Sequence, residues 1–79
     1  MSSESDQYIL QRFGQQVRTL RQRKAMSQEE LAARAGVHRT YIGMIERGEK
    51  NVTIISMMKI ATALDIEISE LLKDFSYGK

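Results

Sequence analysis

Apolar side chains recur every three or four residues along most of the chain, which is the spacing of helices with one buried face. The first such series starts near Gln7 and continues at Ile9, Phe13, Val17 and Leu20. The same spacing predicts four more helices, over about 28–35, 39–47, 54–64 and 69–75. Apolar residues surround almost the whole of the fourth helix, so we expect it to be buried on two sides. The pattern therefore predicts an all-α chain of five helices.

Several polar residues and glycines mark where these helices begin and end. Ser27 and Glu30 have the spacing of a capping box, whose side chains satisfy free amides at a helix start. Thr53 can cap the fourth helix. Gly36 ends the second helix, because glycine enters the left-handed conformation without steric cost. His38 or its neighbour caps the third helix, where no strong capping residue is present.

The 79 residues are enough for a single domain with a thin core. We expect residues 7–75 to form it, after a disordered, polar and acidic tail over 1–6 and before a flexible tail over 76–79. The chain has no Cys and one His, which excludes disulfides, thiolate metal sites and most other metal centres. No cofactor site is predicted, and oligomerisation remains as the way to stabilise so small a core.

No segment has the character of a membrane span or of an export signal. The longest uninterrupted apolar runs, 8–10 and 31–33, are three residues each, whereas a spanning helix needs about 20. The first six residues lack the basic and apolar regions of a signal peptide. We therefore expect a cytoplasmic protein without a membrane partner.

Charge is distributed unevenly along the chain. Residues 12–50 carry nine basic and four acidic side chains, a net charge of +5, whereas 1–11 carry −2 and 51–79 carry −1. This asymmetry indicates a basic binding face beside a neutral packing or association region. A solvated, charged helix surface explains the same distribution, so charge alone leaves both interpretations open.

The two short helices at 28–35 and 39–47 have the spacing of a helix-turn-helix. Ala32 is small enough to let the helix at 39–47 approach the helix at 28–35, and Gly36 allows the sharp turn between them. Apolar residues at 37, 42 and 45 fill the angle between the helices. The outer face of the third helix is then left with Arg39, Thr40, Gly43, Met44 and Arg47.

Two segments, SQEELAARAG at 27–36 and VHRTYIGMIERG at 37–48, resemble the lambda-repressor-like (Xre) helix-turn-helix family. Within that family, the runs 38–42 and 45–53 are most similar to the controller proteins of restriction–modification systems. The family pattern covers about residues 8–75. The resemblance implies a compact five-helix, lambda-repressor-like DNA-binding domain whose helix-turn-helix is formed by the second and third helices.

The same resemblance implies which residues contact DNA. Base edges in the major groove would be read by Arg39, which fits guanine, by Thr40, and by Met44 through apolar contact. Gly43 departs from the polar residue common at its position, so a base contact is lost there or replaced by closer approach of the backbone. Contacts to the DNA backbone are implied for Gln28, Tyr41, Arg47, Lys50 and Asn51.

Some of these residues also have plainer interpretations, which the sequence leaves open. Gln28 sits at a helix N-terminus, where free amides attract phosphate, and its alternative is a surface residue of the first turn. Tyr41 could be a partly buried core ring and Lys50 a free surface side chain. For Arg39 the alternative is a phosphate contact without sequence information.

Two further groups of residues are assigned to the fold and to assembly. By resemblance, Arg21 and Glu46 form a structural ion pair between the first and third helices. The last two helices carry more apolar residues than a thin core absorbs, and such a surplus marks an interface. We therefore expect a dimer interface at Ile54, Ile66, Ile68, Leu72 and Phe75, although all five could pack internally.

Together these features predict a transcriptional regulator that binds a palindromic operator in double-stranded DNA as a homodimer. As a controller protein it would activate and repress its own promoter, and a tetramer on DNA and contact with RNA polymerase stay open. The alternatives are a generic phage-type repressor, an antitoxin-like regulator that acts with a protein partner, and an interaction module without DNA binding. No catalytic triad or phosphate loop is present, and the acid pairs Glu29–Glu30 and Asp65/Glu67 are better explained as helix-end residues, so we do not expect an enzyme.

Overall fold

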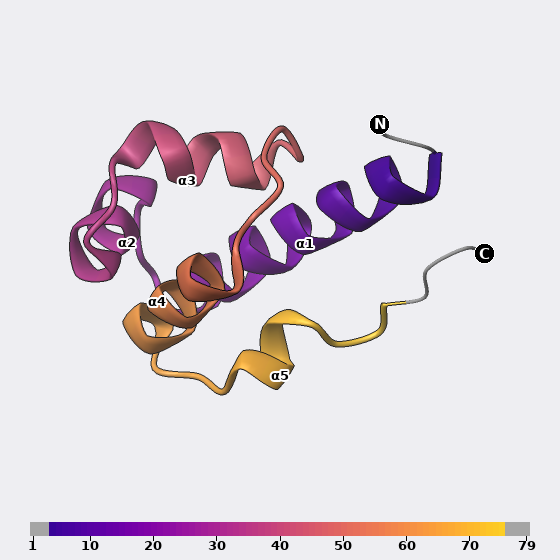
Figure 1. The fold of residues 1–79 in the computed structure, drawn as a ribbon. Coiled ribbons are helices and arrows are strands. Elements are labelled where there is room, and N and C mark those ends of the chain that lie inside the picture. Colours follow the sequence, from indigo (N-terminus) through magenta and orange to yellow (C-terminus); the bar gives the residue numbers. More distant parts are fainter. Residues whose placement is uncertain (1–3, 76–79) are drawn as a thin grey trace.

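The computed structural model describes residues 4–75 and places them in five helices, with no strand in that range. The helices are α1 (Glu4–Arg23), α2 (Gln28–Ala35), α3 (Arg39–Glu46), α4 (Ile54–Leu64) and α5 (Ile68–Leu71) (Figure 1). The predicted all-α class and the helix count are confirmed for this part of the chain. None of these helices is both long and apolar enough to cross a membrane.

The first helix is longer than its apolar pattern indicated. It begins at Glu4, so residues 4–6, expected in the tail, are helical, while 1–3 and 76–79 lie outside the described residues. Acidic side chains lie in its first turn and basic ones in its last, which suits the helix dipole. Its buried face carries Phe13, Val17 and Leu20, as the spacing predicted.

The helix starts are capped by the residues that the sequence indicated. The Ser27 hydroxyl accepts a hydrogen bond from the amide of Glu30 at 2.9 Å, and the Thr53 hydroxyl accepts one from Ser56 at 3.1 Å. The cap of α3, which the sequence left open between His38 and its neighbour, is His38. Its Nδ1 accepts a hydrogen bond from the amide of Thr40 at 3.2 Å. Each cap satisfies one of the free amides in a first helical turn.

The helix-turn-helix is formed by α2 and α3, which pack against each other through small and branched side chains. Gly36 takes the left-handed conformation, with φ of 72°, and turns the chain between the two helices. The buried residues of the pair are Leu31, Ala32, Ala35, Ile42 and Ile45. The predicted packing of the motif is therefore confirmed.

Gly14 allows α1 to cross the end of α3 at close range. A Cβ atom at this position would collide with the carbonyl oxygen of Ile45 and would lie 2.9 Å from that of Glu46. The glycine is inside a helix, where it costs about 1 kcal/mol relative to Ala. Its presence there is explained by the crossing, which fixes α3 against α1.

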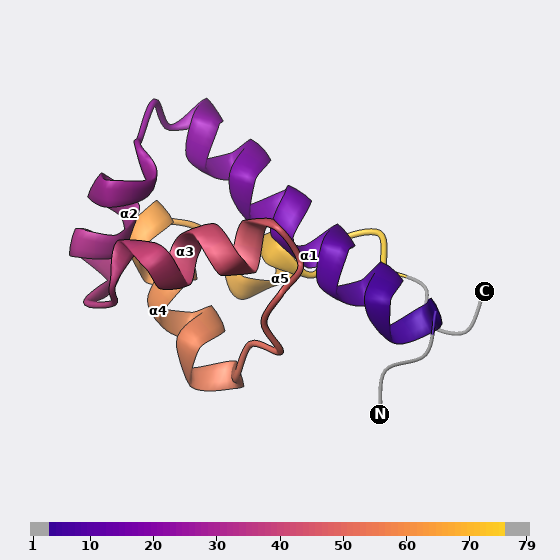
Figure 2. The same cartoon turned by 90° about the horizontal axis from the view of Figure 1, so that it is seen from above.

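The core lies between α1, the helix-turn-helix and the last two helices. Figures 1 and 2 show α3 on one side of α1 and α5 on the other, with α4 beside α2. From α4 and α5 the core receives Ile60, Ala61, Ala63, Leu64 and Leu71.

The fourth and fifth helices depart from the predictions in one respect each. The expectation that α4 is buried on two sides is wrong for the single chain, because Ile54, Ile55 and Met58 are exposed. The expected helix over 69–75 is shorter, since α5 ends at Leu71. The carbonyl of Glu70 accepts a hydrogen bond from Gln16 Nε2 at 2.8 Å, so a side chain of α1 occupies a group that a continuing helix would use.

Candidate nucleic-acid interface

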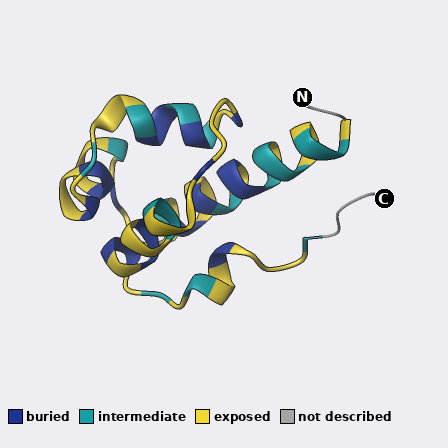
Figure 3. Cartoon of the chain, in the orientation of Figure 1, coloured by how far each residue is buried: buried dark blue, intermediate teal, exposed yellow. Residues whose placement is uncertain are grey.

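The outer face of α3 is separated from its buried face by the helical period. Ile42 and Ile45 point into the core, so residues 40, 43 and 47 lie on the opposite side, one turn after another. The first turn of α3 is exposed (Figure 3). The helix therefore presents a polar face to solvent while its apolar side is fixed by α1 and α2.

Arg39 and Thr40 are exposed at the start of α3, as the prediction of base contacts requires. Arg39 Nη1 lies 3.8 Å from Glu29 Oε2, and both side chains are largely exposed. A long, solvated ion pair of this kind contributes little stability, so it does not prevent Arg39 from reaching another partner. The two side chains that we expect to read bases are thus accessible.

Met44 and Tyr41 are less accessible than Arg39 and Thr40. Met44 is half-buried. Tyr41 is also half-buried, and its ring packs against the core cluster. The structure thus gives Tyr41 the packing role that the sequence left open. It tests neither the predicted backbone contact of Tyr41 nor the predicted base contact of Met44.

Arg47 and Gly43 are one turn apart on the outer face. Arg47 forms two hydrogen bonds with Glu49, from Nε to Oε2 at 3.0 Å and from Nη2 to Oε1 at 3.2 Å. Gly43 is buried although it faces outward, because the side chains of Arg47 and Gln28 lie above it. The departure from the family pattern at Gly43 is therefore accompanied by an arginine that covers the glycine.

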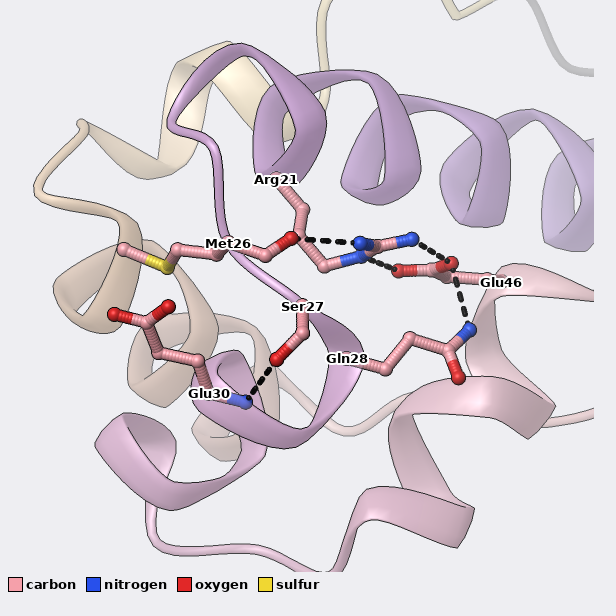
Figure 4. A network of polar contacts seen from close by, with 6 residues as sticks. All are labelled: Arg21, Met26, Ser27, Gln28, Glu30 and Glu46. Carbon is pink, nitrogen blue, oxygen red and sulfur yellow. Dashed lines mark hydrogen bonds and ion pairs between the residues drawn. The ribbon is translucent and has the colours of Figure 1, made fainter.

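Arg21 and Glu46 form the ion pair that the resemblance implied. Arg21 Nε lies 2.7 Å from Glu46 Oε2, and Nη2 donates to Oε1 at 3.0 Å (Figure 4). Arg21 also donates from Nη1 to the carbonyl of Met26 at 2.8 Å. Since Met26 precedes α2, this group of contacts joins α1, α2 and α3 behind the exposed face of the recognition helix.

Gln28 belongs to the same polar group, which the sequence did not predict. Its Nε2 donates to Glu46 Oε1 at 3.0 Å (Figure 4). The first residue of α2 therefore contributes to the junction with α3, in addition to the backbone contact with DNA expected for it. No local sequence signal identifies an amide–carboxylate contact between residues 18 positions apart, so only the folded chain reveals it.

Lys50 and Asn51 lie in the loop between α3 and α4, and both are exposed. The loop starts at Gly48, whose φ of 75° ends α3. A side chain at Gly48 would approach Gln11 of α1 to within 2.8 Å, so the loop passes close to α1. These two of the residues predicted to contact the DNA backbone thus follow the C-terminal end of the recognition helix.

The predicted dimer residues divide into two groups. Ile54 and Leu72 expose 59% and 42% of their surface, far more than core residues do. The other three, Ile66, Ile68 and Phe75, are partly buried and pack against the core of their own chain. Two further apolar residues of α4, Ile55 and Met58, are exposed and were not predicted. An apolar surface on α4 is therefore present, and it is wider than expected.

Comparison with known proteins identifies relatives over most of the chain. A helix-turn-helix family model matches residues 17–71. The control protein C.BamHI of Bacillus amyloliquefaciens is 49% identical over 65 residues, which are 81% of this chain and 79% of the relative. The control protein C.SmaI of Serratia marcescens is 43% identical over 60 residues, 76% of this chain and 71% of the relative.

Solved structures agree with these sequence matches. The crystal structure of the restriction–modification controller protein C.AhdI from Aeromonas hydrophila has 52% sequence identity and a TM-score of 0.78, over 78% of this chain and 94% of that one. The controller protein C.Esp1396I, solved as a tetramer with its natural 35-base-pair operator, has 34% identity and a TM-score of 0.73. That match covers 84% of this chain and 97% of the C.Esp1396I chain.

Proposed function

From the premise that the chain belongs to the helix-turn-helix family and, within it, to the restriction–modification controller proteins, we propose its function. It binds a palindromic operator as a homodimer and regulates its own promoter. The observation that carries the proposal is the exposed polar face of α3, held in place by the buried Arg21–Glu46 pair. Such a helix fits the major groove of B-DNA.

The proposed contacts follow from the position of each side chain on this face. Arg39 and Thr40, exposed at the start of α3, read base edges, and Met44 adds an apolar contact. The other proposed residues position the domain through contacts with the DNA backbone. These residues are Gln28, Tyr41, Arg47, Lys50 and Asn51. Under this proposal the function is binding, and no catalytic step is required of the chain.

The proposed regulation depends on occupancy of adjacent sites. We infer activation at low concentration, through contact with RNA polymerase, and repression once further operator sites fill. The operator-bound tetramer of C.Esp1396I supports a second dimer binding beside the first. Similarity to controller proteins favours this function over that of a phage-type repressor or of an antitoxin-like regulator that needs a protein partner.

Selection from random duplexes tests the proposal. At about 150 mM salt, where weak non-specific binding is suppressed, the protein should enrich a palindrome. Its half-sites should be about 34 Å apart, one turn of the duplex. Arg39→Ala should abolish the enrichment, whereas Arg34→Ala, which removes an exposed arginine of α2, should leave it unchanged. Binding that is sensitive to salt but blind to sequence would contradict the proposal.

A further inference from the structure

The side chain of Arg47 lies back over the helix that carries it. A Cβ atom built on Gly43 would be 3.2 Å from Arg47 Nη1, although the two residues are four positions apart. Side chains on a helix tilt toward its N-terminus, so residue 47 covers the surface near residue 43 when that surface is empty. The missing side chain at Gly43 therefore allows the guanidinium to lie at the middle of the outer face.

Glu49 is the hydrogen-bond partner of this guanidinium, in a pair whose side chains are both about half exposed. Its carboxylate accepts from Nε at 3.0 Å and from Nη2 at 3.2 Å, and this hydrogen bonding, together with the negative charge, raises the pKa of Arg47. An arginine has five N–H donors in a planar fork, and the carboxylate takes two of them. Nη1 donates to no acceptor among residues 4–75. The end of the fork, with donors on both terminal nitrogens, remains available.

We propose that Arg47 reads guanine through O6 and N7 in the major groove, and that Gly43 makes this possible by leaving room for its guanidinium. Two parallel donors on the end of an arginine match these two acceptors. This inference rests on the proposed operator binding, and it moves Arg47 from the DNA backbone to the bases. Positions 39 and 43 are about 6 Å apart along the helix, more than one base-pair step of about 3.4 Å, so Arg39 and Arg47 address different base pairs.

A charge-preserving variant separates base reading from phosphate contact. On the operator selected by the wild-type protein, Arg47→Lys should lower affinity about ten- to a hundredfold, because lysine cannot form the paired contact. Preference at one guanine position should disappear, while affinity for a scrambled duplex and its salt dependence stay the same. Arg34→Lys, on an exposed arginine of α2, is the matched control and should change neither. If Arg47→Lys binds like the wild type while Arg47→Ala weakens all duplexes alike, Arg47 contacts phosphate and the inference is overturned.

Modified operators identify the base atom directly. Replacing the guanine at that position with 7-deazaguanine removes the N7 acceptor and should weaken the wild-type complex about tenfold, but should leave the Arg47→Lys complex unchanged. An equal loss in both proteins would overturn the inference. If the wild-type protein selects no sequence at all, the proposed function fails and the inference fails with it. A selected operator without a guanine dependent on Arg47 overturns the inference alone.

The role of Gly43 is tested by adding one methyl group. Gly43→Ala should reduce the same guanine preference, because its Cβ displaces Nη1, whereas the helix itself gains propensity and stays folded. Circular dichroism and thermal melting verify the fold of the variant. In the Arg47→Lys background, Gly43→Ala should have almost no further effect, since the contact is already lost. Independent, additive losses would show that Gly43 does not act through Arg47.

Discussion

Arg21 at the end of α1 and Glu46 at the end of α3 are joined by two hydrogen bonds, of 2.7 and 3.0 Å, in a nearly water-free position. Their side chains are only 11% and 4% exposed. The carbonyl of Met26 and the amide of Gln28 take up further hydrogen bonds of the pair. No buried side-chain nitrogen or oxygen among the described residues lacks a hydrogen-bond partner, and each of the three nitrogens of the Arg21 guanidinium donates at least once.

Removing one partner of this pair should be costly. Arg21→Ala leaves the Glu46 carboxylate buried without its countercharge, and we expect the free energy of unfolding to fall by about 3–5 kcal/mol. Urea denaturation followed by circular dichroism measures it. Arg34→Ala breaks the 2.8 Å pair with Glu30, which is half exposed, and should cost about 0–1 kcal/mol. If Arg21→Ala kept its stability but lost DNA binding, the pair would belong to the interface instead.

Gly14→Ala should destabilise the protein although it improves helix propensity. The added Cβ meets backbone oxygens of Ile45 and Glu46, which cannot move without shifting α3. We expect a net loss of about 2 kcal/mol, because overpacking outweighs a propensity gain of about 1 kcal/mol. The melting temperature should fall by about 10 °C.

The control for this substitution is a glycine without close neighbours. A Cβ atom added at Gly36 would meet no atom within 4 Å, but the residue takes φ of 72°, so Gly36→Ala should cost about 1 kcal/mol through the backbone alone. A melting temperature that rises in Gly14→Ala would show that α1 and α3 do not cross as closely as the structure indicates.

Ala25 is a site where glycine should stabilise the protein. It ends α1 in the left-handed conformation, with φ of 57°, and its amide donates to Gln22 while that of Met26 donates to Arg21. This is a Schellman ending, in which glycine is favoured. Ala25→Gly should raise the free energy of unfolding by about 0.5–1 kcal/mol in urea denaturation, because the steric cost at Cβ disappears.

The control uses an alanine in the ordinary helical conformation. Ala33 is exposed within α2, and Ala33→Gly should lower the free energy of unfolding by about 1 kcal/mol. If both substitutions destabilised the protein equally, the ending at Ala25 would not carry the strain that its φ angle implies.

The helix-turn-helix could be predicted closely because its signals are local. The capping residue Ser27 and the glycine at 36 lie next to the helix they delimit, and α2 begins and ends where they indicate. Of the predicted capping box only the Ser27 bond is observed, because the Glu30 side chain accepts from Arg34. The apolar spacing did not predict the end of α5, where the carbonyl of Glu70 accepts a hydrogen bond from Gln16, 54 positions earlier in the chain. Distant contacts of this kind leave no trace in the apolar spacing of a segment.

In the candidate interface, too, the features set by local sequence could be predicted and those set by side-chain contacts could not. Helical periodicity was enough to place Arg39 and Thr40 on the outer face of α3. The contact of Gln28 with Glu46 and the position of Arg47 over Gly43 depend on side-chain conformations, which a pattern of residue types does not determine. The sequence therefore predicted which residues face outward, but not how their side chains are held.

The exposed apolar surface of α4 and α5 leads to a prediction about assembly. Ile54 is 59% exposed in the single chain, so replacing it with Glu should hardly lower the stability of the monomer. Leu72 is 42% exposed and also lines an apolar hollow beside Phe13, so the stability of Leu72→Glu is measured alongside its assembly. If they lie in the dimer interface, each buried side chain contributes about 1.5–3 kcal/mol. Ile54→Glu and Leu72→Glu should therefore raise the dimer dissociation constant at least tenfold in sedimentation equilibrium.

Ile55→Glu is the matched control, because Ile55 is equally exposed but lines a hollow with Arg34 and Met58 on another side of α4. Loss of the dimer in Ile55→Glu, with Ile54→Glu unchanged, would move the interface to that hollow. A wild-type protein that stays monomeric at micromolar concentration would rule out the proposed interface.

Operator binding provides a second readout, since a palindrome is matched only when a dimer holds two recognition helices about 34 Å apart. Ile54→Glu should therefore bind the full operator little better than a single half-site, although every residue of its recognition helix is intact.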